Sequence, residues 1–325
     1  MRRSRWSSSI PSVLLVTAGD ATRRTGGNIY IRHLLRALRR DGLRVRVLAL
    51  DDRRDTAAVR TARPDIAIVD TIAAELAAPH LRAMRRRGTR VLVLALMRRG
   101  AARLARQADR TIAVSAALAA ELVSAGVARS NVLVISPGID RVPRARPAGD
   151  VRVLCVANWS AAKGIHTLLA AARQIPEISI DLVGDALDAR YAARVRRLAA
   201  APELAGRVRE HGPLSGRALA RQYQHATLFA LPSTRESYGM AVAQALAHGL
   251  PVIACDIPAT REVASGAAVL VPPGRVSPLV TALRRLARDR RARSTLARRA
   301  RARARAFNTW EQTERQLVRA VRSVY

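Results

Sequence analysis

Short apolar runs alternate with amphipathic helical stretches along almost the whole chain, and this alternation constrains the fold more than any other feature. In the first half, strands are predicted at Ser12–Ala18, Arg44–Leu50, Asp65–Val69, Arg90–Leu96, Arg110–Val114 and Val132–Ile135. Helices are predicted between them, at Tyr30–Arg40, Ala73–Arg86, Ala101–Gln107 and Ala116–Ser124. Strands that are apolar throughout and separated by helices are typical of a parallel sheet covered on both faces.

The alternation is interrupted once, by the segment SPGIDRVPRARPAGD, and then starts again. This segment holds three prolines and two glycines, so it predicts a connection between domains. Further strands are predicted at Val151–Ala157, Ile178–Gly184, Arg207–His211, Thr227–Leu231, Pro251–Cys255 and Ala268–Val271. Further helices are predicted at Gly164–Arg173, Ala189–Ala200, Ser215–His225, Gly239–Ala247 and Ser277–Arg288, followed by a basic helical tract at Arg291–Ala306 and a last helix.

A chain of 325 residues fits two α/β domains of about 150 residues each. We therefore predict two Rossmann-like domains with parallel sheets facing a central cleft. Their expected extents are 1–140 and 151–306, with a linker at 141–150 and a C-terminal helical segment at 307–325. The active site is expected in the cleft between the domains.

The charge of the chain bears on its partners. Lysine and arginine number 57 against 24 aspartates and glutamates, a formal charge of +33, which favours anionic membrane or nucleic acid. Aromatic residues make up only 3%, which argues against stacking of exposed bases, so no specific nucleic acid is expected. All basic residues but Lys163 are arginine, a skew that a GC-rich coding sequence would produce, so many are expected on solvated faces.

Signals for targeting and oxidation are weak. Met1–Arg3 followed by Ile10–Ala18 faintly resembles a signal peptide, but Pro11 interrupts the apolar stretch and a buried strand explains it better. No run approaches the ~18 apolar residues that cross a bilayer. Cys155 and Cys255 lie in separate apolar segments, so a reducing, cytoplasmic location is expected.

A glycine pair, Gly26 and Gly27, follows the first predicted strand and precedes a helix. Paired glycines there let the backbone approach an anion at the helix N-terminus. A plain tight turn explains the pair equally simply, and the glycine pattern of a dinucleotide site is missing.

Lys163 and Gly164 form a second candidate, at the turn after the first strand of the second domain. A lysine ammonium at such a turn can meet a phosphate. An ordinary solvated lysine is the alternative, weakened here because every other basic position is arginine.

The segment PSTRESYGM, at residues 232–240, is the third candidate. It leads from a strand into a helix and presents backbone donors at Tyr238, Gly239 and Met240. Glu236 would there bond a sugar hydroxyl or balance developing positive charge. The alternative is a carboxylate favoured by the helix dipole.

Gln244 follows Glu236 by eight residues, which is about two turns of helix. The two side chains are expected on a similar face if the helix reaches back to residue 236. A lone glutamine at such a place would otherwise be an ordinary surface residue.

Together these residues resemble family-4 glycosyltransferases of the GT-B fold. The resemblance rests on Gly26-Gly27, Lys163-Gly164, Leu182-Val183-Gly184, His211-Gly212-Pro213-Leu214 and PSTRESYGMAVAQALAHGLPVIACD in this order. It covers nearly the whole chain, is strongest from Val151 to Pro273, and includes a closing helix after Phe307–Trp310 that would return to the first domain. It implies retaining, metal-independent transfer of a sugar from a nucleotide-diphosphate donor to an unknown acceptor.

The resemblance also implies roles for individual residues. Lys163 would neutralise the donor diphosphate, and Glu236 would be the carboxylate that contacts the donor sugar. The residues implied in donor binding are Gly26, Gly27, Asn158, Lys163, Gly164, Leu214, Ser237, Tyr238, Gly239, Met240 and Gln244. The resemblance implies no metal or separate cofactor, so fixed cations and helix N-termini would have to stabilise the leaving diphosphate.

Three positions depart from the family pattern. Gln244 stands where the second carboxylate is usual, which removes a charged acceptor. Asn158 replaces a frequent arginine. Leu96-Met97-Arg98 stands where the first domain usually has a histidine, and Arg98 or Arg99 is the candidate for a substitute cation.

These departures keep a second function open, a catalytically degenerate scaffold that binds polyanions or a membrane surface. The arginine-rich tract 284–305 supplies its support. A third hypothesis joins the two: an enzyme uses its basic surface to reach an anionic or lipid-linked acceptor, peripheral at the inner face of the membrane.

Overall fold

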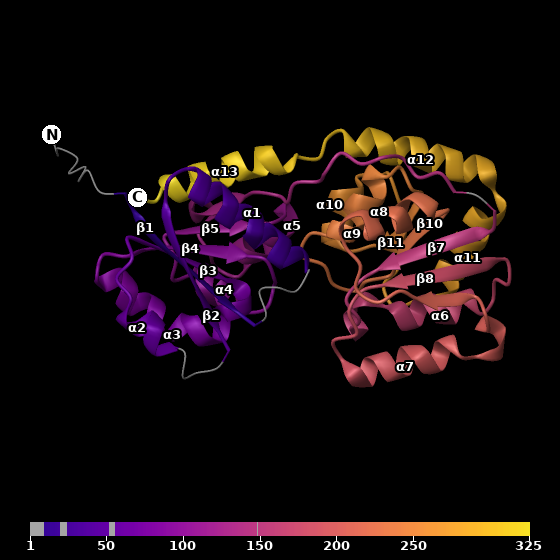
Figure 1. The fold of residues 1–325 in the computed structure, drawn as a ribbon, viewed down its shortest axis with the longest axis horizontal. Coiled ribbons are helices and arrows are strands. Elements are labelled where there is room, and N and C mark those ends of the chain that lie inside the picture. Colours follow the sequence, from indigo (N-terminus) through magenta and orange to yellow (C-terminus); the bar gives the residue numbers. More distant parts are fainter. Residues whose placement is uncertain (1–9, 20–24, 52–55, 148) are drawn as a thin grey trace. The chain divides into compact units, whose positions relative to one another are not determined.

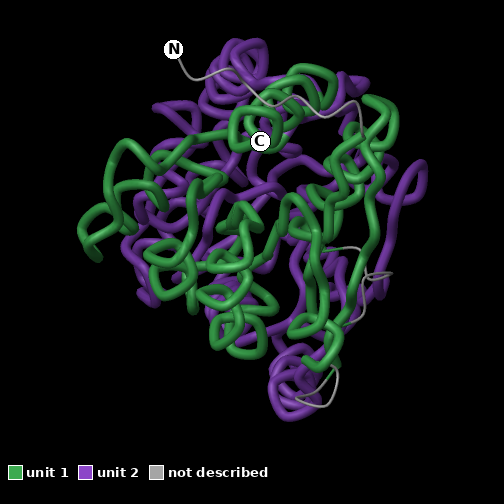
Figure 2. The backbone as a smooth tube through the Cα atoms, turned by 90° about the vertical axis from the view of Figure 1, so that its left-hand side faces the viewer, with its two compact units in different colours: residues 1–137, 310–325 green, residues 138–309 purple. Residues whose placement is uncertain are grey.

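The computed structural model describes residues 10–19, 25–51, 56–147 and 149–325, which form two compact units (Figure 2). The first unit contains residues 1–137 and 310–325, and the second contains residues 138–309. Each unit is built on its own six-stranded parallel sheet with helices around it, which confirms the predicted α/β class (Figure 1). The signal-like residues Met1–Arg3 lie outside the described residues.

The sheet of the first unit has the strand order β2-β1-β3-β4-β5-β6, all parallel. Its strands are β1 (Ser12–Ala18), β2 (Arg44–Leu50), β3 (Ile66–Asp70), β4 (Arg90–Ala95), β5 (Arg110–Ala113) and β6 (Val132–Val134). Its helices are α1 (Gly26–Arg40), α2 (Thr56–Thr61), α3 (Ala74–Arg86), α4 (Ala101–Ala105), α5 (Ala116–Ser124) and α13 (Trp310–Arg322). The order reverses between β1 and β3, which makes the carboxyl ends of these two strands the switch point of the unit.

The sheet of the second unit has the order β12-β11-β10-β7-β8-β9, again all parallel. Its strands are β7 (Val151–Val156), β8 (Ile178–Val183), β9 (Val208–Glu210), β10 (Leu228–Leu231), β11 (Val252–Cys255) and β12 (Val269–Val271). Its helices are α6 (Ile165–Ala172), α7 (Ala189–Ala199), α8 (Gly216–His225), α9 (Met240–Ala247), α10 (Pro258–Ala264), α11 (Val276–Arg288) and α12 (Arg290–Ala304). This is the doubly wound Rossmann order, with the switch point between β7 and β10.

Burial explains why the strands are apolar throughout. Every residue of β3, β10 and β11 is buried, because helices cover both faces of each sheet. The sequence analysis missed α2 and α10. The first is a six-residue helix with only Val59 buried, and the second begins with Pro258 directly after a strand and its turn.

The last helix, α13, completes the first unit by packing on α1 (Figure 1). The ring of Trp310 stacks on His33 with the ring centroids 3.7 Å apart. His33 Nδ1 lies 2.7 Å from Glu314 Oε1, and the Thr313 hydroxyl donates to the Ser136 carbonyl at 3.0 Å. The core of the first unit therefore depends on residues that follow the second unit in the sequence.

The segment expected as a linker is bound along the second unit. The amide of Ala145 donates to the His248 carbonyl at 2.8 Å, and the amide of Arg146 donates to the Gln224 carbonyl at 2.7 Å. His248 Nδ1 donates to the Pro143 carbonyl at 2.8 Å. Proline and glycine ended the helices and strands here as expected, but they did not leave this stretch free of contacts.

Arginine in the last helical turn accounts for part of the positive charge. All six described helices of eleven or more residues carry two arginines there, and these are α1, α3, α7, α11, α12 and α13. Cations near a helix C-terminus interact favourably with the helix dipole, typically by about 0.3–1 kcal/mol each. Many arginines thus have a structural reason that needs no external partner.

Candidate functional site

The sequence candidates of the second unit come together at its switch point. In the parallel pairing of β7 with β10, Val153 lies opposite Leu228 and Leu154 opposite Phe229, so the two strands end level with each other. The chain leaves β7 toward Lys163 and leaves β10 toward Glu236. The crevice outside the carboxyl ends at such a reversal is where open α/β sheets bind ligands.

Lys163 and Glu236 form an ion pair at this point, with 2.7 Å between Nζ and Oε1. Lys163 ends the 3₁₀ turn Ala161–Lys163, and Glu236 lies in the loop between β10 and α9. The Glu236 side chain is only 9% exposed and that of Lys163 is 28% exposed. The pair is therefore largely withdrawn from water, while the ammonium stays within reach of a ligand.

Close approach of the two loops holds this pair together. Gly164 has a left-handed φ of 68°, and a Cβ atom there would lie 2.2 Å from the Pro232 carbonyl oxygen. On the other side of the turn, the amide of Thr234 donates to the Ala162 carbonyl at 2.8 Å. Glycine is therefore required at position 164, and the sequence signal for it was the Lys163-Gly164 pair.

The helix α9 directs its N-terminus to the same edge. Gly239 is its N-cap with φ 102°, and no side chain caps it among the residues that the structure describes. The uncapped N–H groups that begin at Met240 are available to an anion. Tyr238 is 7% exposed, and burial raises the pKa of its phenol to about 12, so its side chain belongs to the core and only its backbone can face a ligand.

Asn158 links neighbouring loops. Its Oδ1 accepts from the amide of Asp185 at 3.3 Å, and the amide of Trp159 donates to the Asp185 carbonyl at 2.8 Å. Gly184 completes this link, because a Cβ atom there would lie 1.8 Å from the Ala157 carbonyl oxygen. Asn158 therefore ties the end of β7 to the end of β8, a structural task the sequence did not reveal.

Leu214 and Ser237 were both expected at the donor site, and this role stays a prediction. Leu214 is half-buried in the loop between β9 and α8, and Ser237 is half-buried in the loop before α9. Both loops follow the carboxyl ends of strands in the second unit. Both residues thus lie on the same edge of the sheet as Lys163.

The condition for a shared helical face of Glu236 and Gln244, a helix that reaches back to residue 236, is not met. The helix α9 begins only at Met240, because Gly239 holds a left-handed φ that ends the helical conformation. Gln244 instead faces Tyr223, whose hydroxyl donates to its Oε1 at 3.3 Å. The glutamine is held by a buried phenol of α8, a partner that no local pattern in the sequence indicated.

The candidates of the first unit lie at the start of α1. This helix begins at Gly26, and the hydroxyl of Thr25 caps it by accepting from the amide of Asn28 at 3.1 Å. A Cβ atom on Gly27 would meet Leu96 at 3.6 Å, an ordinary contact. Packing therefore does not demand glycine at 27, and its predicted role at the donor stays a prediction.

Arg98 and Arg99 do not stand free as substitute cations. Arg98 Nε lies 2.7 Å from Glu121 Oε2, and Arg99 Nη2 lies 2.8 Å from Glu75 Oε1. Carboxylates that are distant in the sequence neutralise both guanidinium groups. The role of either arginine in place of the missing histidine stays a prediction.

A buried carboxyl that the sequence analysis missed, Asp70, lies at the switch point of the first unit. Its Oδ1 accepts from the amides of Ile72 and Ala73 at 2.8 and 3.1 Å, and its Oδ2 accepts from the Thr17 hydroxyl at 2.5 Å. The residue has no exposed surface, and burial raises the pKa of its carboxyl to about 6. An acidic residue that ends an apolar strand was the available signal.

Asp70→Asn is expected to change how stability depends on pH. A folded pKa raised above the unfolded value means that Asp70 favours folding below about pH 4 and that this contribution is lost as the pH rises through 6. The unfolding free energy of the wild type minus that of the variant should fall by roughly 2 kcal/mol between pH 4 and pH 7. Urea titrations at both values measure it, and a constant difference would contradict the raised pKa.

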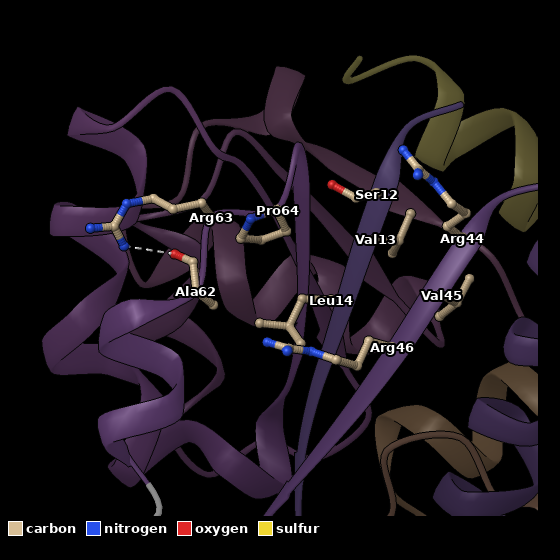
Figure 3. A pocket seen from close by; sticks show the side chains of 9 residues that line it. All are labelled: Ser12, Val13, Leu14, Arg44, Val45, Arg46, Ala62, Arg63 and Pro64. Atoms are coloured by element: carbon tan, nitrogen blue, oxygen red, sulfur yellow. Dashed lines mark hydrogen bonds between the residues drawn. The ribbon is translucent and has the colours of Figure 1, made fainter. Parts of the chain in front are cut away.

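A pocket of about 620 Å³ in the first unit lies away from its switch point (Figure 3). It opens at the amino ends of the strands, beside Ser12 and Arg44, the first residues of β1 and β2. Arg63 turns to the carbonyl of Ala62, 3.0 Å away, and Arg44 donates to the Ile10 carbonyl at 2.8 Å. Its position is the edge opposite to the one where such sheets bind ligands.

Metal ligands and cysteines add no further site in the described part of the chain. No group of three or more His, Cys, Asp and Glu side chains there has the arrangement to hold a metal ion. Cys155 and Cys255 are buried free thiols, and burial raises their pKa values to about 12 and 11. Among the described helices, none is long and apolar enough to cross a membrane.

Comparison with protein families gives two matches. Residues 139–303, about half of the chain, match the model described as glycosyl transferases group 1. Residues 63–142 match the model described as glycosyltransferase family 4. The first match contains the switch point of the second unit with Lys163 and Glu236.

Curated relatives match over part of their length. Sulfoquinovosyl transferase SQD2 of Arabidopsis thaliana is 30% identical over 156 residues, 46% of this chain and 29% of that protein. A D-inositol 3-phosphate glycosyltransferase of Mycobacterium sp. (strain KMS) is 32% identical over 158 residues, 43% of this chain and 36% of that protein. The chain thus spans about a third of the length of these relatives.

Solved structures share the fold over nearly the whole chain. Sucrose-phosphate synthase from Thermosynechococcus elongatus has a TM-score of 0.83 at 21% identity, covering 97% of this chain and 99% of that one. Anabaena HepE, in complex with UDP and glucose, has a TM-score of 0.81 at 20% identity, covering 96% and 100%. At these identities the likeness concerns the fold.

Proposed function

The chain belongs to the group 1 glycosyl transferases, of family 4 and the GT-B fold, and from this we propose that it transfers a sugar from a nucleotide-diphosphate donor with retention of configuration. One observation carries the proposal. Lys163 is the only lysine in the chain, and it forms an ion pair with the largely buried carboxylate of Glu236. The pair lies at the switch point of a sheet with the Rossmann strand order. A cation, a carboxylate and an uncapped helix N-terminus at one edge match what a diphosphate and a sugar require.

Lys163 and the N-terminus of α9 would receive the diphosphate. Without a donor, Glu236 holds the Lys163 ammonium at 2.7 Å. When the diphosphate arrives, the ammonium turns to its oxygens and leaves the Glu236 carboxylate free to accept hydrogen bonds from sugar hydroxyls. The same fixed charges support metal-independent transfer, because they neutralise the leaving group as its charge develops.

In the proposed reaction, the bond between the anomeric carbon and the diphosphate oxygen breaks while an acceptor hydroxyl attacks from the same face. The leaving diphosphate carries away the bonding electron pair, and one of its oxygens takes the proton of the acceptor hydroxyl. Lys163 holds that oxygen's charge in place, and Glu236 stabilises the positive charge that develops on the sugar ring.

The remaining parts of the proposal concern the acceptor and the place of action. The complex of HepE with UDP and glucose supports a nucleoside diphosphate as the donor's leaving group. The net charge of +33 supports an anionic or lipid-linked acceptor. Two buried free thiols support a reducing, cytoplasmic setting.

A thermal-shift series tests the donor site. The purified protein is heated with UDP, GDP, ADP or TDP and their sugar conjugates in moderate salt, with inorganic diphosphate as the control for charge attraction. A ligand at about 100 times its Kd adds about 2.7 kcal/mol, which is readily detected. We expect one nucleotide to stand out. Equal shifts with every polyanion would instead favour the degenerate scaffold that binds through its basic surface.

A further inference from the structure

The segment 284–305 spans the end of α11 and all of α12, and half of its residues are arginine. This segment contains eleven arginines and one acidic residue, Asp289. Asp289 is the N-cap of α12 and accepts from the amide of Ala292 at 2.9 Å. The single carboxylate is thus engaged in capping, and the segment as a whole is strongly cationic.

Three arginines of α12 are part of the structure of the second unit. Arg293 donates to the carbonyls of Leu286 and Ala287, each at 2.7 Å, and so closes the C-terminal end of α11. Arg303 donates to the Val263 carbonyl at 2.8 Å and does the same for α10. Arg301 lies along Gly249, where a Cβ atom would meet it at 3.0 Å.

Three other arginines form a line along α12 and its C-cap residue, Arg305. Arg291, Arg298 and Arg305, here called the arginine row, are exposed and follow one another at intervals of seven residues. Seven residues are nearly two full turns, so the three side chains share one face and extend over about 21 Å. Their described contacts are few: Arg298 approaches only the Thr295 hydroxyl of its own helix, at 3.5 Å.

Within the described part of the chain, no carboxylate forms an ion pair with the arginine row. Arg290 and Arg299 flank the row and are exposed as well. Ser294 and Ala302 fill the positions between, so the face carries small side chains and no carboxylate. In Figure 1, α12 lies at the periphery of the second unit.

We propose that the arginine row docks the second unit on an anionic lipid bilayer. A line of guanidinium groups on a convex, otherwise small-sided helix matches a plane of phosphate headgroups, and guanidinium pairs well with phosphate. The exposed large apolar residues that the structure describes lie elsewhere, so the contact is electrostatic and at the surface. This function is independent of sugar transfer.

Nucleic acid fits the same face less well. It carries no aromatic residue on which a base could stack and no Asn or Gln that could read base edges. A bilayer needs neither. The phosphate headgroups of an anionic bilayer can pair with every exposed arginine of the row through charge alone.

Vesicle sedimentation tests the proposal with a matched control. The full chain is mixed with vesicles of phosphatidylcholine containing 30 mol% phosphatidylglycerol in 0.15 M salt. The row variant is Arg291→Ser/Arg298→Ser/Arg305→Ser. The control variant, Arg46→Ser/Arg82→Ser/Arg90→Ser, removes equal charge from exposed arginines of the first unit. All six positions are exposed, so both variants should keep their circular dichroism and thermal midpoint.

Each basic residue near an anionic surface is worth about a fivefold change in partitioning. We expect the row variant to bind these vesicles about a hundredfold more weakly than the wild type, and the control variant to bind within about fivefold of it. Equal losses in both variants would overturn the proposal, as would equal wild-type binding to pure phosphatidylcholine. Tighter binding to a DNA duplex than to the vesicles at the same salt, lost in the row variant, would assign the face to nucleic acid instead.

Discussion

Lys163→Ala should lower kcat/KM for the nucleotide-sugar donor by a factor of about 100–1,000, the loss typical of one preorganised charge in an active site. Lys163 is the only lysine of the chain, and its ammonium lies 2.7 Å from the Glu236 carboxylate at the switch point. In the proposed reaction, its removal would deprive the leaving diphosphate of its fixed cation. Steady-state kinetics with the donor identified by thermal shift measure the effect.

The exposed neighbour Arg235 provides the control. Arg235→Ala removes the same charge from the neighbouring loop between β10 and α9. Glu236 and Thr234 on either side of it contact the Lys163 turn, while Arg235 has no described side-chain partner. We expect a change within about threefold, as for an exposed charge screened by solvent. Equal losses in both variants would mean that overall charge, and not Lys163 itself, serves the donor.

Gly164→Ala should lower the unfolding free energy of the second unit by about 3 kcal/mol, through left-handed strain and overpacking together. The backbone has φ 68°, and the new Cβ atom would lie 2.2 Å from the Pro232 carbonyl oxygen. Because that oxygen belongs to a buried backbone, the turn must move away from the β10 loop. Urea unfolding, followed by the fluorescence of the nearby buried Trp159, measures the loss.

Gly206 separates the two causes. It has nearly the same φ, 71°, but no atom lies within 4 Å of its virtual Cβ. Gly206→Ala therefore carries the conformational strain without the clash, and should cost only about 1 kcal/mol. If both substitutions cost the same, the close approach of Gly164 to Pro232 does not limit stability.

The alternation of apolar strands with helices was enough to predict two α/β domains, each with a parallel sheet. Burial on both faces makes each strand apolar throughout and therefore recognisable on its own. The strand order was beyond reach. Placing β1 between β2 and β3 in one unit, and β7 between β8 and β10 in the other, depends on long-range packing. Their places at strand-to-helix turns and the family resemblance indicated Lys163 and Glu236 separately, and only the fold pairs them.

What the sequence could not reveal about the candidate site has one physical cause. The side chains that contact its residues are distant in the sequence. The sequence does not show that Glu121 and Glu75 form ion pairs with Arg98 and Arg99. Gln244 was assigned a helical face without knowledge of Tyr223. Local signals such as glycine, proline and strand ends indicate where a loop lies, but a contact across the fold decides what its side chains do.

The return of α13 to the first unit has a consequence for the order in which the protein can be made. The second unit is one continuous stretch, residues 138–309, and all of it has been synthesised before Trp310 appears. The first unit, although translated first, waits for the buried residues Trp310, Leu317 and Val321 to close its core. On the ribosome, the later half of the sequence can therefore reach its native packing before the earlier half does.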